Sequence, residues 1–277
     1  MNDPAISIVM PMFNSENYLY NSIRSILSQS FQDFELLIID DGSEDNCVGL
    51  VSEIKDSRIK LHQNKHDFIG SLNMGLDLSK GRYIARTDSD DIMHPDKLKI
   101  QYQFMEENPE VDVCGTWAKC FGIKDNEITA PQSHNEIASA LLFGNMLIHP
   151  SVMMRRESID KNNLRYKHEY IYAEDYKLWV DCVMSGLKLA NIPEILLNYF
   201  CGENQVTNRH YDKMMNVTGR IRIKYAEYVI NLLAGIDDDS YIFMEKLNTL
   251  LDNDRISTKS FFYILSSFYK DYLNKHE

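Results

Sequence analysis

Short apolar segments alternate with helical patterns through the first half of the chain, and this alternation constrains the fold more than any other feature. Four apolar runs rich in β-forming residues cover residues 6–10, 35–40, 59–62 and 83–86. Segments with apolar residues at helical intervals lie between and after them, at residues 18–27, 46–55, 68–78 and 97–107. Continuous apolar strands separated by helices predict an α/β fold with a mostly parallel central sheet, flanked by helices on both faces.

The pattern then becomes less regular and finally entirely helical. Strands are predicted at residues 111–118 and 152–155, and helices at residues 135–143 and 174–184. From about residue 208 onward only helical spacing occurs, over residues 214–233, 241–251 and 260–273. We therefore predict an α/β domain over residues 1–205 and a C-terminal helical region over residues 206–277.

Composition excludes several classes of protein. The 277 residues include 41 acidic and 29 basic side chains, a net charge of −12 that repels phosphate backbones, so we expect no nucleic acid partner. The five cysteines show no C-x-x-C spacing and are expected to be free thiols. Neither a signal peptide nor an apolar run long enough for a membrane span is recognisable, so we expect a cytoplasmic protein.

Polar residues follow three of the predicted strands, at residues 11–14, 40–43 and 87–91. In open α/β sheets, ligands bind outside the carboxyl ends of the strands, so these loops are expected to meet at one edge. The turn Asp88-Ser89-Asp90-Asp91 carries three carboxylates that a divalent cation would compensate. A solvated acidic turn that caps the next helix is the alternative. The position of the turn at a strand end favours the metal hypothesis.

Phosphate-binding glycine motifs are absent. The first strand is not followed by G-x-G-x-x-G, and there is no Walker A lysine. Phosphates would then be neutralised by a metal, which favours a nucleotide diphosphate as the ligand.

Glu174 and Asp175 open a predicted helix. Acidic residues in a first helical turn are often only structural, because they complement the helix dipole. The functional hypothesis is that one of them is a general base within hydrogen-bond reach of an acceptor hydroxyl. His149, just before the strand at residues 152–155, is either a buried structural histidine or a ligand at the same cleft.

Six segments occur in an order that resembles family 2 glycosyltransferases, which have the glycosyltransferase-A fold. They are SIVMPMFNSENYL (7–19), SFQDFELLIIDDGSED (30–45), LNMGL (72–76), GRYIARTDSDD (81–91), HPSVMMRR (149–156) and YAEDYKLW (172–179). The resemblance spans roughly residues 5–200. It is strongest to small bacterial enzymes that extend lipooligosaccharide, O-antigen or capsule glycans, including galactosyl- and N-acetylgalactosaminyltransferases.

The resemblance implies a role for each motif residue that contacts the donor. Pro11 and Phe13 would line the uridine pocket, and Asp41 would bind the uracil. Asp88 would lie near the ribose, and Asp90 would bind a divalent cation, Mn²⁺ or Mg²⁺.

The resemblance also implies the reaction. Asp175 would be the catalytic base with Glu174 supporting it, and His149 would lie near the metal or the donor phosphates. One sugar (Gal, GalNAc, Glc or GlcNAc) would move with inversion from a UDP-sugar to a hydroxyl of an oligosaccharide or lipid-linked surface glycan. Two alternatives stay open: a catalytically silent UDP-sugar-binding protein, and a phosphatase built on the D-x-D element.

Three segments depart from the family pattern or lie outside it. The segment HDFIG (66–70) lacks the usual N-x-G pair, and GENQ (202–205) lacks the His of an H-x-x-Q pattern, which leaves the role of Gln205 open. The aromatic tail at residues 261–273 would pack onto the catalytic domain, form a homodimer, or touch the inner face of the plasma membrane as a peripheral contact. The net charge weakens adsorption to anionic lipid, so packing is preferred.

Overall fold

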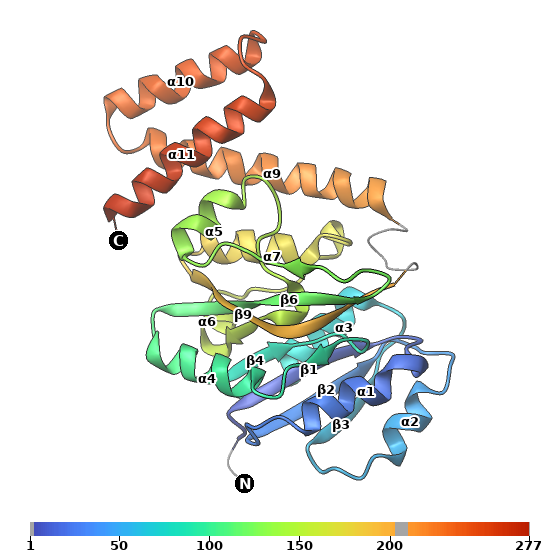
Figure 1. The fold of residues 1–277 in the computed structure, drawn as a ribbon. Helices are drawn as coiled ribbons and strands as arrows, with labels where there is room; N and C mark the ends of the chain where they lie inside the picture. The colour runs from blue at the N-terminus through green and yellow to red at the C-terminus, as the bar shows by residue number, and fades with distance from the viewer. Residues whose placement is uncertain (1–2, 203–209, 277) are drawn as a thin grey trace.

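The centre of the molecule is a nine-stranded mixed sheet that runs in the order β3-β2-β1-β4-β8-β6-β9-β5, with β7 paired to β6 beside this path (Figure 1). A computed structural model describes residues 3–202 and 210–276 of the chain. The strands are β1 (Ile6–Met12), β2 (Phe34–Asp40), β3 (Ile59–Gln63), β4 (Tyr83–Arg86), β5 (Ile92–Met93), β6 (Val111–Gly122), β7 (Glu127–Ile128), β8 (Met153–Arg155) and β9 (Lys188–Cys201).

Helices cover both faces of this sheet. The α-helices are α1 (Glu16–Leu27), α2 (Cys47–Glu53), α3 (Phe68–Leu78), α4 (Lys97–Glu107), α5 (His134–Ala140), α6 (Arg156–Lys161), α7 (Glu174–Met184), α9 (Tyr211–Ala234), α10 (Asp238–Asp252) and α11 (Thr258–His276). Two short 3₁₀ segments, η1 (His149–Ser151) and η2 (His168–Tyr170), lie in the second half. The four strands and four helices predicted for the first half are confirmed as β1–β4 and α1–α4.

The alternation of side chains along β1 and β2 divides the core into two layers. Ile8 and Leu36 point to the face covered by α1, α2 and α4, where they join one hydrophobic cluster. Val9 and Leu37 point to the opposite face and join a second cluster with α3, α5 and α7. Successive residues of a strand face opposite sides, so a strand buried on both faces must be apolar throughout. This accounts for the continuous apolar runs in the sequence.

The parallel pairing in the first half aligns the strand ends. In β1, Met12 pairs with Asp40 of β2, and Val9 pairs with Arg86 of β4. β1 lies between β2 and β4, so the loops that follow all three strands open at the same edge of the sheet. The predicted convergence of these loops is therefore confirmed.

The strands predicted at residues 111–118 and 152–155 are confirmed as β6 and β8, whereas β5, β7 and β9 were not predicted from the sequence. The 14-residue β9 pairs in parallel with β6, while β8 pairs antiparallel with β4 and with β6. Pro193 interrupts the pattern of β9, since proline has no N–H to donate. The register of β6 and β9 shifts between Thr116 and Trp117, and Pro193 falls in the unpaired stretch between Ile192 and Ile195. The pairing of β9 with β6 tolerates Pro193, because no hydrogen bond from its nitrogen is needed at this point of the ladder.

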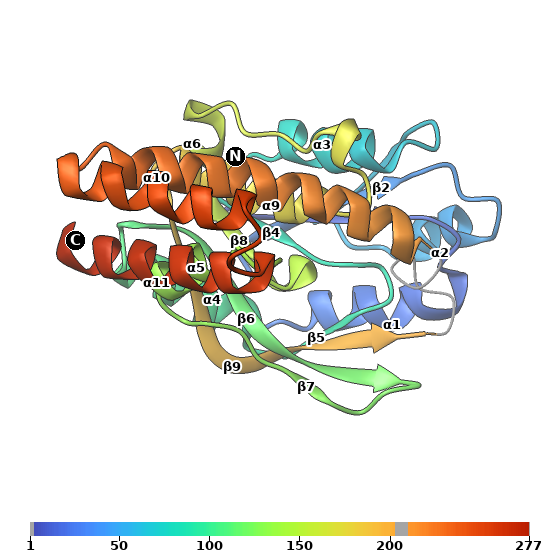
Figure 2. The ribbon, with the colours of Figure 1, turned by 90° about the horizontal axis from the view of Figure 1, so that it is seen from above.

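The C-terminal helices share the hydrophobic cluster that covers one face of the sheet (Figure 2). Phe261, Phe262, Leu265 and Tyr269 of α11 are buried in it, so this part of the aromatic tail packs onto the rest of the chain, as preferred. The predicted division at residues 205/206, and Gln205 itself, lie outside the described residues. Dimer formation and membrane contact stay predictions.

Two further expectations concern the cysteines and the membrane. All five cysteines are buried and free, as predicted. Across residues 3–202 and 210–276, no helix combines the length and the apolar character needed to cross a bilayer.

Gly81 provides a test of how closely β1 and β4 approach. A Cβ at this position would lie 2.4 Å from the backbone nitrogen of Ser7 and 2.7 Å from the carbonyl carbon of Ile6. Because backbone cannot move aside cheaply, we expect Gly81→Ala to lower the free energy of unfolding by about 1–3 kcal/mol. A Cβ on Gly219, inside α9, would meet no atom within 4 Å, so Gly219→Ala should raise the free energy of unfolding by about 0.5–1 kcal/mol. Urea denaturation of both variants measures the difference, and equal effects would contradict this packing.

Candidate active site

The first strand delivers two of the predicted nucleotide-binding residues to the open edge of the sheet. Pro11 is buried within β1, whereas the Phe13 side chain just beyond its end is 43% exposed. The Phe13 ring lies 4.4 Å from the His66 ring, centroid to centroid, at an interplanar angle of 36°. The loop before α3 therefore supplies one wall beside Phe13, and the exposure of this residue leaves it accessible to a flat ligand such as a base.

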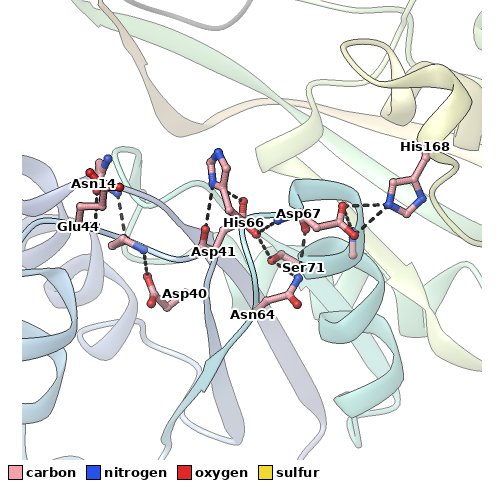
Figure 3. A network of polar contacts seen from close by, with 11 residues as sticks. Asn14, Asp40, Asp41, Glu44, Asn64, His66, Asp67, Ser71 and His168 are labelled. Carbon is pink, nitrogen blue, oxygen red and sulfur yellow. Dashed lines mark hydrogen bonds and ion pairs between the residues drawn. The ribbon is translucent and has the colours of Figure 1, made fainter.

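Asp41 is held by the loop that departs from the family pattern (Figure 3). Its Oδ1 accepts hydrogen bonds from the backbone N–H of Asp67 and from Ser71 Oγ, both at 2.7 Å. His66 Nδ1 lies 3.1 Å from the Asp41 carbonyl oxygen and 3.6 Å from Oδ2. Only Oδ2 of this nearly buried carboxylate is left with capacity for a ligand. The segment HDFIG thus orients Asp41.

A contact distant in sequence connects this loop to the second half of the chain. His168 Nε2 lies 2.9 Å and 3.0 Å from the two carboxylate oxygens of Asp67 (Figure 3). Asp67 is the N-cap of α3, and its Oδ1 accepts a hydrogen bond from the backbone N–H of Gly70. The hydrogen bond from Gly70 and, to a smaller extent, the one to His168 hold the pKa of Asp67 below its usual range. The η2 segment is thereby fixed beside the nucleotide-side loops.

The acidic turn after β4 is organised by a buried arginine. Arg86 is 3% exposed, and its two terminal nitrogens meet the two oxygens of Asp88 at 2.7 Å and 2.5 Å. This bidentate geometry is the one that guanidinium and carboxylate groups favour. Ser22 Oγ of α1 donates to the Asp88 carbonyl oxygen at 3.2 Å and fixes the turn from the other side. Asp88 is therefore oriented before any ligand binds.

The three carboxylates of this turn fit a divalent cation. One oxygen each from Asp88, Asp90 and Asp91 lie within 4.8 Å of one another. Asp91 Oδ1 accepts the backbone N–H of Phe200 at 2.8 Å, but its buried Oδ2 has no hydrogen-bond partner. Burial and the charge of Asp88 raise the pKa of Asp90 to about 7. An arrangement of hard oxygen donors with uncompensated charge suits Mn²⁺ or Mg²⁺.

The predicted catalytic pair begins α7. Asn145 Nδ2 donates to Asp175 Oδ2 at 2.6 Å, and the backbone N–H of Tyr176 donates to Asp175 Oδ1 at 2.6 Å. Both oxygens of this partly exposed carboxylate are oriented. Glu174 is 8% exposed, and its buried Oε2 has no partner. Burial and then the charge of Asp175 raise the pKa of Glu174 to about 7.

The backbone just before this pair is strained. Tyr172 has φ 77°, a region that non-glycine residues adopt rarely and at a free-energy cost. Its ring stacks on His210 at 4.4 Å, centroid to centroid, which stabilises the conformation from the helical region. Such strain concentrates at functional sites, in agreement with the predicted role of Glu174 and Asp175.

Arg86 links the two acidic groups electrostatically. Its charge lowers the pKa values of Asp90 and Asp91, against the dominant effect of burial. It acts in the same direction on Glu174 and Asp175, whose pKa values burial raises. One buried cation therefore acts on carboxylates that follow β4 and on carboxylates that begin α7.

His149 has a structural partner. Its Nε2 lies 2.8 Å from the Tyr166 hydroxyl, and its ring packs edge-on against Trp179 at 6.1 Å between centroids. Burial holds the pKa of His149 well below its usual range, so the ring is neutral. With Nε2 engaged, only Nδ1 could reach a ligand, and the predicted contact with phosphate or metal stays a prediction.

Sequence patterns did not identify every polar residue of the site. Arg86 could have been identified from the sequence, because a charged residue at the end of an otherwise apolar strand indicates a functional position. Lys97, the first residue of α4, is fully buried with no hydrogen-bond partner for Nζ, and burial lowers its pKa to about 8. Asn145 and Tyr166 gave no signal, since their partners Asp175 and His149 are brought to them only by the fold.

Solved structures establish the fold class. The Staphylococcus aureus protein TarS, residues 1–349, crystallised in complex with UDP-GlcNAc, matches with a TM-score of 0.68 at 20% identity, over 83% of this chain and 67% of that one. The chain has the glycosyltransferase-A fold, as the resemblance implied.

Sequence comparisons establish the family. The model of glycosyl transferase family 2 matches residues 7–170. An uncharacterized glycosyltransferase of Haemophilus influenzae is 32% identical over 85% of this chain and 77% of its own length. The Escherichia coli enzyme WfgD, a UDP-Glc:α-D-GlcNAc-diphosphoundecaprenol β-1,3-glucosyltransferase, is 32% identical over 75% of this chain and 79% of its own length. The chain therefore belongs to glycosyl transferase family 2 and is a glycosyltransferase.

The raised pKa of Glu174 predicts a pH-dependent loss of stability. The unfolded chain loses this proton near pH 4.5 and the folded chain near pH 7, so stability falls as the pH rises between these values. Because Gln cannot ionise, we expect Glu174→Gln to be more stable than wild type above pH 7, by up to about 3 kcal/mol, and nearly equal to it below pH 4.5.

Urea denaturation at pH 4.5 and pH 8 measures this difference. The exposed Glu227→Gln serves as the matched control and should not change the pH dependence. A stability difference between Glu174→Gln and wild type that stays the same at both pH values would contradict the buried, protonated state of Glu174.

Proposed function

We propose that this enzyme transfers one sugar, with inversion, from a UDP-sugar to a hydroxyl of a bacterial surface-glycan acceptor, and that it requires a divalent cation. The observation that carries the proposal is the pair of acidic groups, Asp88–Asp91 and Glu174–Asp175: the buried Arg86 binds Asp88 at 2.5 Å and 2.7 Å, and its charge acts on both groups. The specificity named for WfgD supports UDP as the nucleotide and a diphosphate-linked lipid as the carrier of the acceptor. Gal, GalNAc, Glc and GlcNAc are the candidate sugars.

The donor would bind at the edge formed by the ends of β1, β2 and β4. The exposed ring of Phe13 suits stacking of the uracil, and Pro11 would line the same pocket from the end of β1. Asp41 would accept a hydrogen bond from the base through Oδ2, since Oδ1 is already engaged. Asp88, oriented by Arg86, would accept a hydrogen bond from the ribose.

Asp90 and the free oxygen of Asp91 are the residues that would hold the cation. When bound, the cation would act as a Lewis acid that stabilises negative charge on the departing diphosphate. The residues 1–205 would supply all of these groups, and this is the part of the chain that we propose as the catalytic domain.

Asp175 would act as the general base. Its carboxylate would take the proton of the acceptor hydroxyl while that oxygen attacks the anomeric carbon. The new glycosidic bond forms as the bond between the anomeric carbon and UDP breaks, and UDP leaves with the electron pair. Asn145 and the Tyr176 N–H orient the carboxylate, which matters because a base must lie within hydrogen-bond reach of its proton. Glu174 would support this orientation beside it.

Asp175→Asn tests the base. The amide cannot accept the proton, so we expect kcat to fall by roughly 10²–10⁴-fold while UDP binding stays unchanged. Transfer from radiolabelled UDP-sugars and calorimetry with UDP are the two measurements. Asp252→Asn, at the exposed end of α10, is the matched control. Full activity in the Asp175 variant would exclude this residue as the base.

Asp90→Ala tests the metal. Without this carboxylate, we expect UDP binding to lose most of its dependence on Mn²⁺, and transfer to fall in parallel. Calorimetry with UDP in the presence of Mn²⁺, and again in EDTA, measures the effect. An unaltered difference between these two conditions in the variant would show that Asp90 does not hold the cation.

A further inference from the structure

Basic side chains gather around two tyrosines immediately before the catalytic helix, in a protein whose net charge is −12. Lys177 Nζ lies 5.3 Å, Lys224 Nζ 5.5 Å and Arg220 Cζ 5.6 Å from the centroid of the Tyr170 ring. Lys213 Nζ lies 6.0 Å from the Tyr172 ring, and Lys167 shares the Asp181 carboxylate with Lys177. We call this set the cation group: Lys167, Lys177, Lys213, Arg220 and Lys224.

Three members of the cation group form a row on α9. Lys213, Arg220 and Lys224 are spaced by seven and four residues, so they share one face of the helix. At 1.5 Å per residue the row is about 16 Å long. α9 packs along α7 (Figure 1), and the row therefore runs beside the helix that carries the proposed base.

None of the three charges of this row is neutralised by a direct ion pair within the described residues, although the charge of Glu169 acts on Lys224. Arg220 donates instead to the backbone carbonyl of Glu169 at 2.8 Å, and Lys224 donates to the Tyr170 hydroxyl at 2.8 Å. All three side chains belong to exposed residues. Each retains further N–H donors that an anion can accept.

The row begins next to the proposed base. Lys213 lies over Tyr172, and Tyr172 is separated from Glu174 by a single residue. In the orientation that we infer, an acceptor sugar with its hydroxyl at Asp175 has its far side toward the row. In an acceptor carried on a lipid diphosphate, that far side bears the two phosphates, and the row offers the positive charge that matches them.

We propose that the cation group, through Arg220 and Lys224, binds the diphosphate of a lipid-linked acceptor. The proposal rests on the proposed function and adds to it the residues that recognise the diphosphate of the acceptor. Acceptors with the diphosphate would be preferred over the same sugar on a neutral alkyl chain. Donor binding would not depend on the cation group.

The test compares two acceptors and the double variant Arg220→Gln/Lys224→Gln. One acceptor is N-acetylglucosaminyl diphosphate with a short alkyl chain, and the other is the alkyl glycoside of the same sugar. Loss of charge-assisted hydrogen bonds to phosphate should raise KM for the diphosphate acceptor about tenfold or more, with kcat retained. KM for the alkyl glycoside and affinity for UDP should stay the same, and the latter shows that the variant is folded.

Lys259→Gln is the matched control. Lys259 also lies over a tyrosine ring, Tyr263, at 5.8 Å, but on α11. This variant should not change KM for either acceptor. Equal changes in KM for both acceptors, or no change for the diphosphate acceptor, would overturn the proposal.

Two further measurements separate this proposal from others. If the double variant loses binding to phosphatidylglycerol vesicles without acceptor while its KM for the diphosphate acceptor is unchanged, the cation group binds lipid headgroups and the proposal is wrong. Transfer to neither acceptor by the wild type would refute the proposed function. In that case, calorimetry with the diphosphate acceptor still tests the cation group. Weaker binding by the double variant than by the wild type would support the role of the cation group, and equal binding would refute it.

Discussion

A buried guanidinium at the end of β4 is the interaction on which the site depends. Arg86 is removed from water, and a buried cation is tolerated only with compensating negative charge nearby. The bidentate pair with Asp88 supplies this charge, and Arg86 lowers the pKa values of Asp90 and Glu174 against the larger effect of burial. In turn, Arg86 makes it possible for several carboxylates to be buried close together. Neither the buried guanidinium of Arg86 nor the carboxylates around it would be stable there without the other.

The site also carries a cost in stability. Several buried polar atoms without hydrogen-bond partners belong to residues around it, namely Arg86 Nε, Asp91 Oδ2, Lys97 Nζ and Glu174 Oε2. Buried polar groups are normally satisfied, so this concentration is unusual for a packed interior. Under the proposed function, the free oxygen of Asp91 would be available to the cation. The proposed function would explain why these positions hold polar residues, although apolar residues there would make the folded protein more stable.

The two halves of the chain contribute differently to this arrangement. The parallel strands β1, β2 and β4 deliver the nucleotide-side residues to one edge, and the register Met12 to Asp40 fixes their alignment. The second half brings Asn145, Glu174 and Asp175, and the contact of His168 with Asp67 joins both halves. α9 then adds a row of positive charge beside α7. The proposed donor-side and acceptor-side residues thus come from separate segments, which the continuous sheet and one hydrophobic cluster join.

Local patterns in the sequence determined the strands and helices of the first half, because burial on both faces requires unbroken apolar runs. They also placed Asp41, Asp88 and Asp90 at strand ends, where an α/β sheet binds ligands. The length of β9 was hidden by Pro193, which only pairing with β6 accommodates. The partners of His149, Asp67 and Asp175 were decided by tertiary structure alone. Contacts between residues far apart in the chain leave no periodic signal, since periodicity reports only which face of an element is buried.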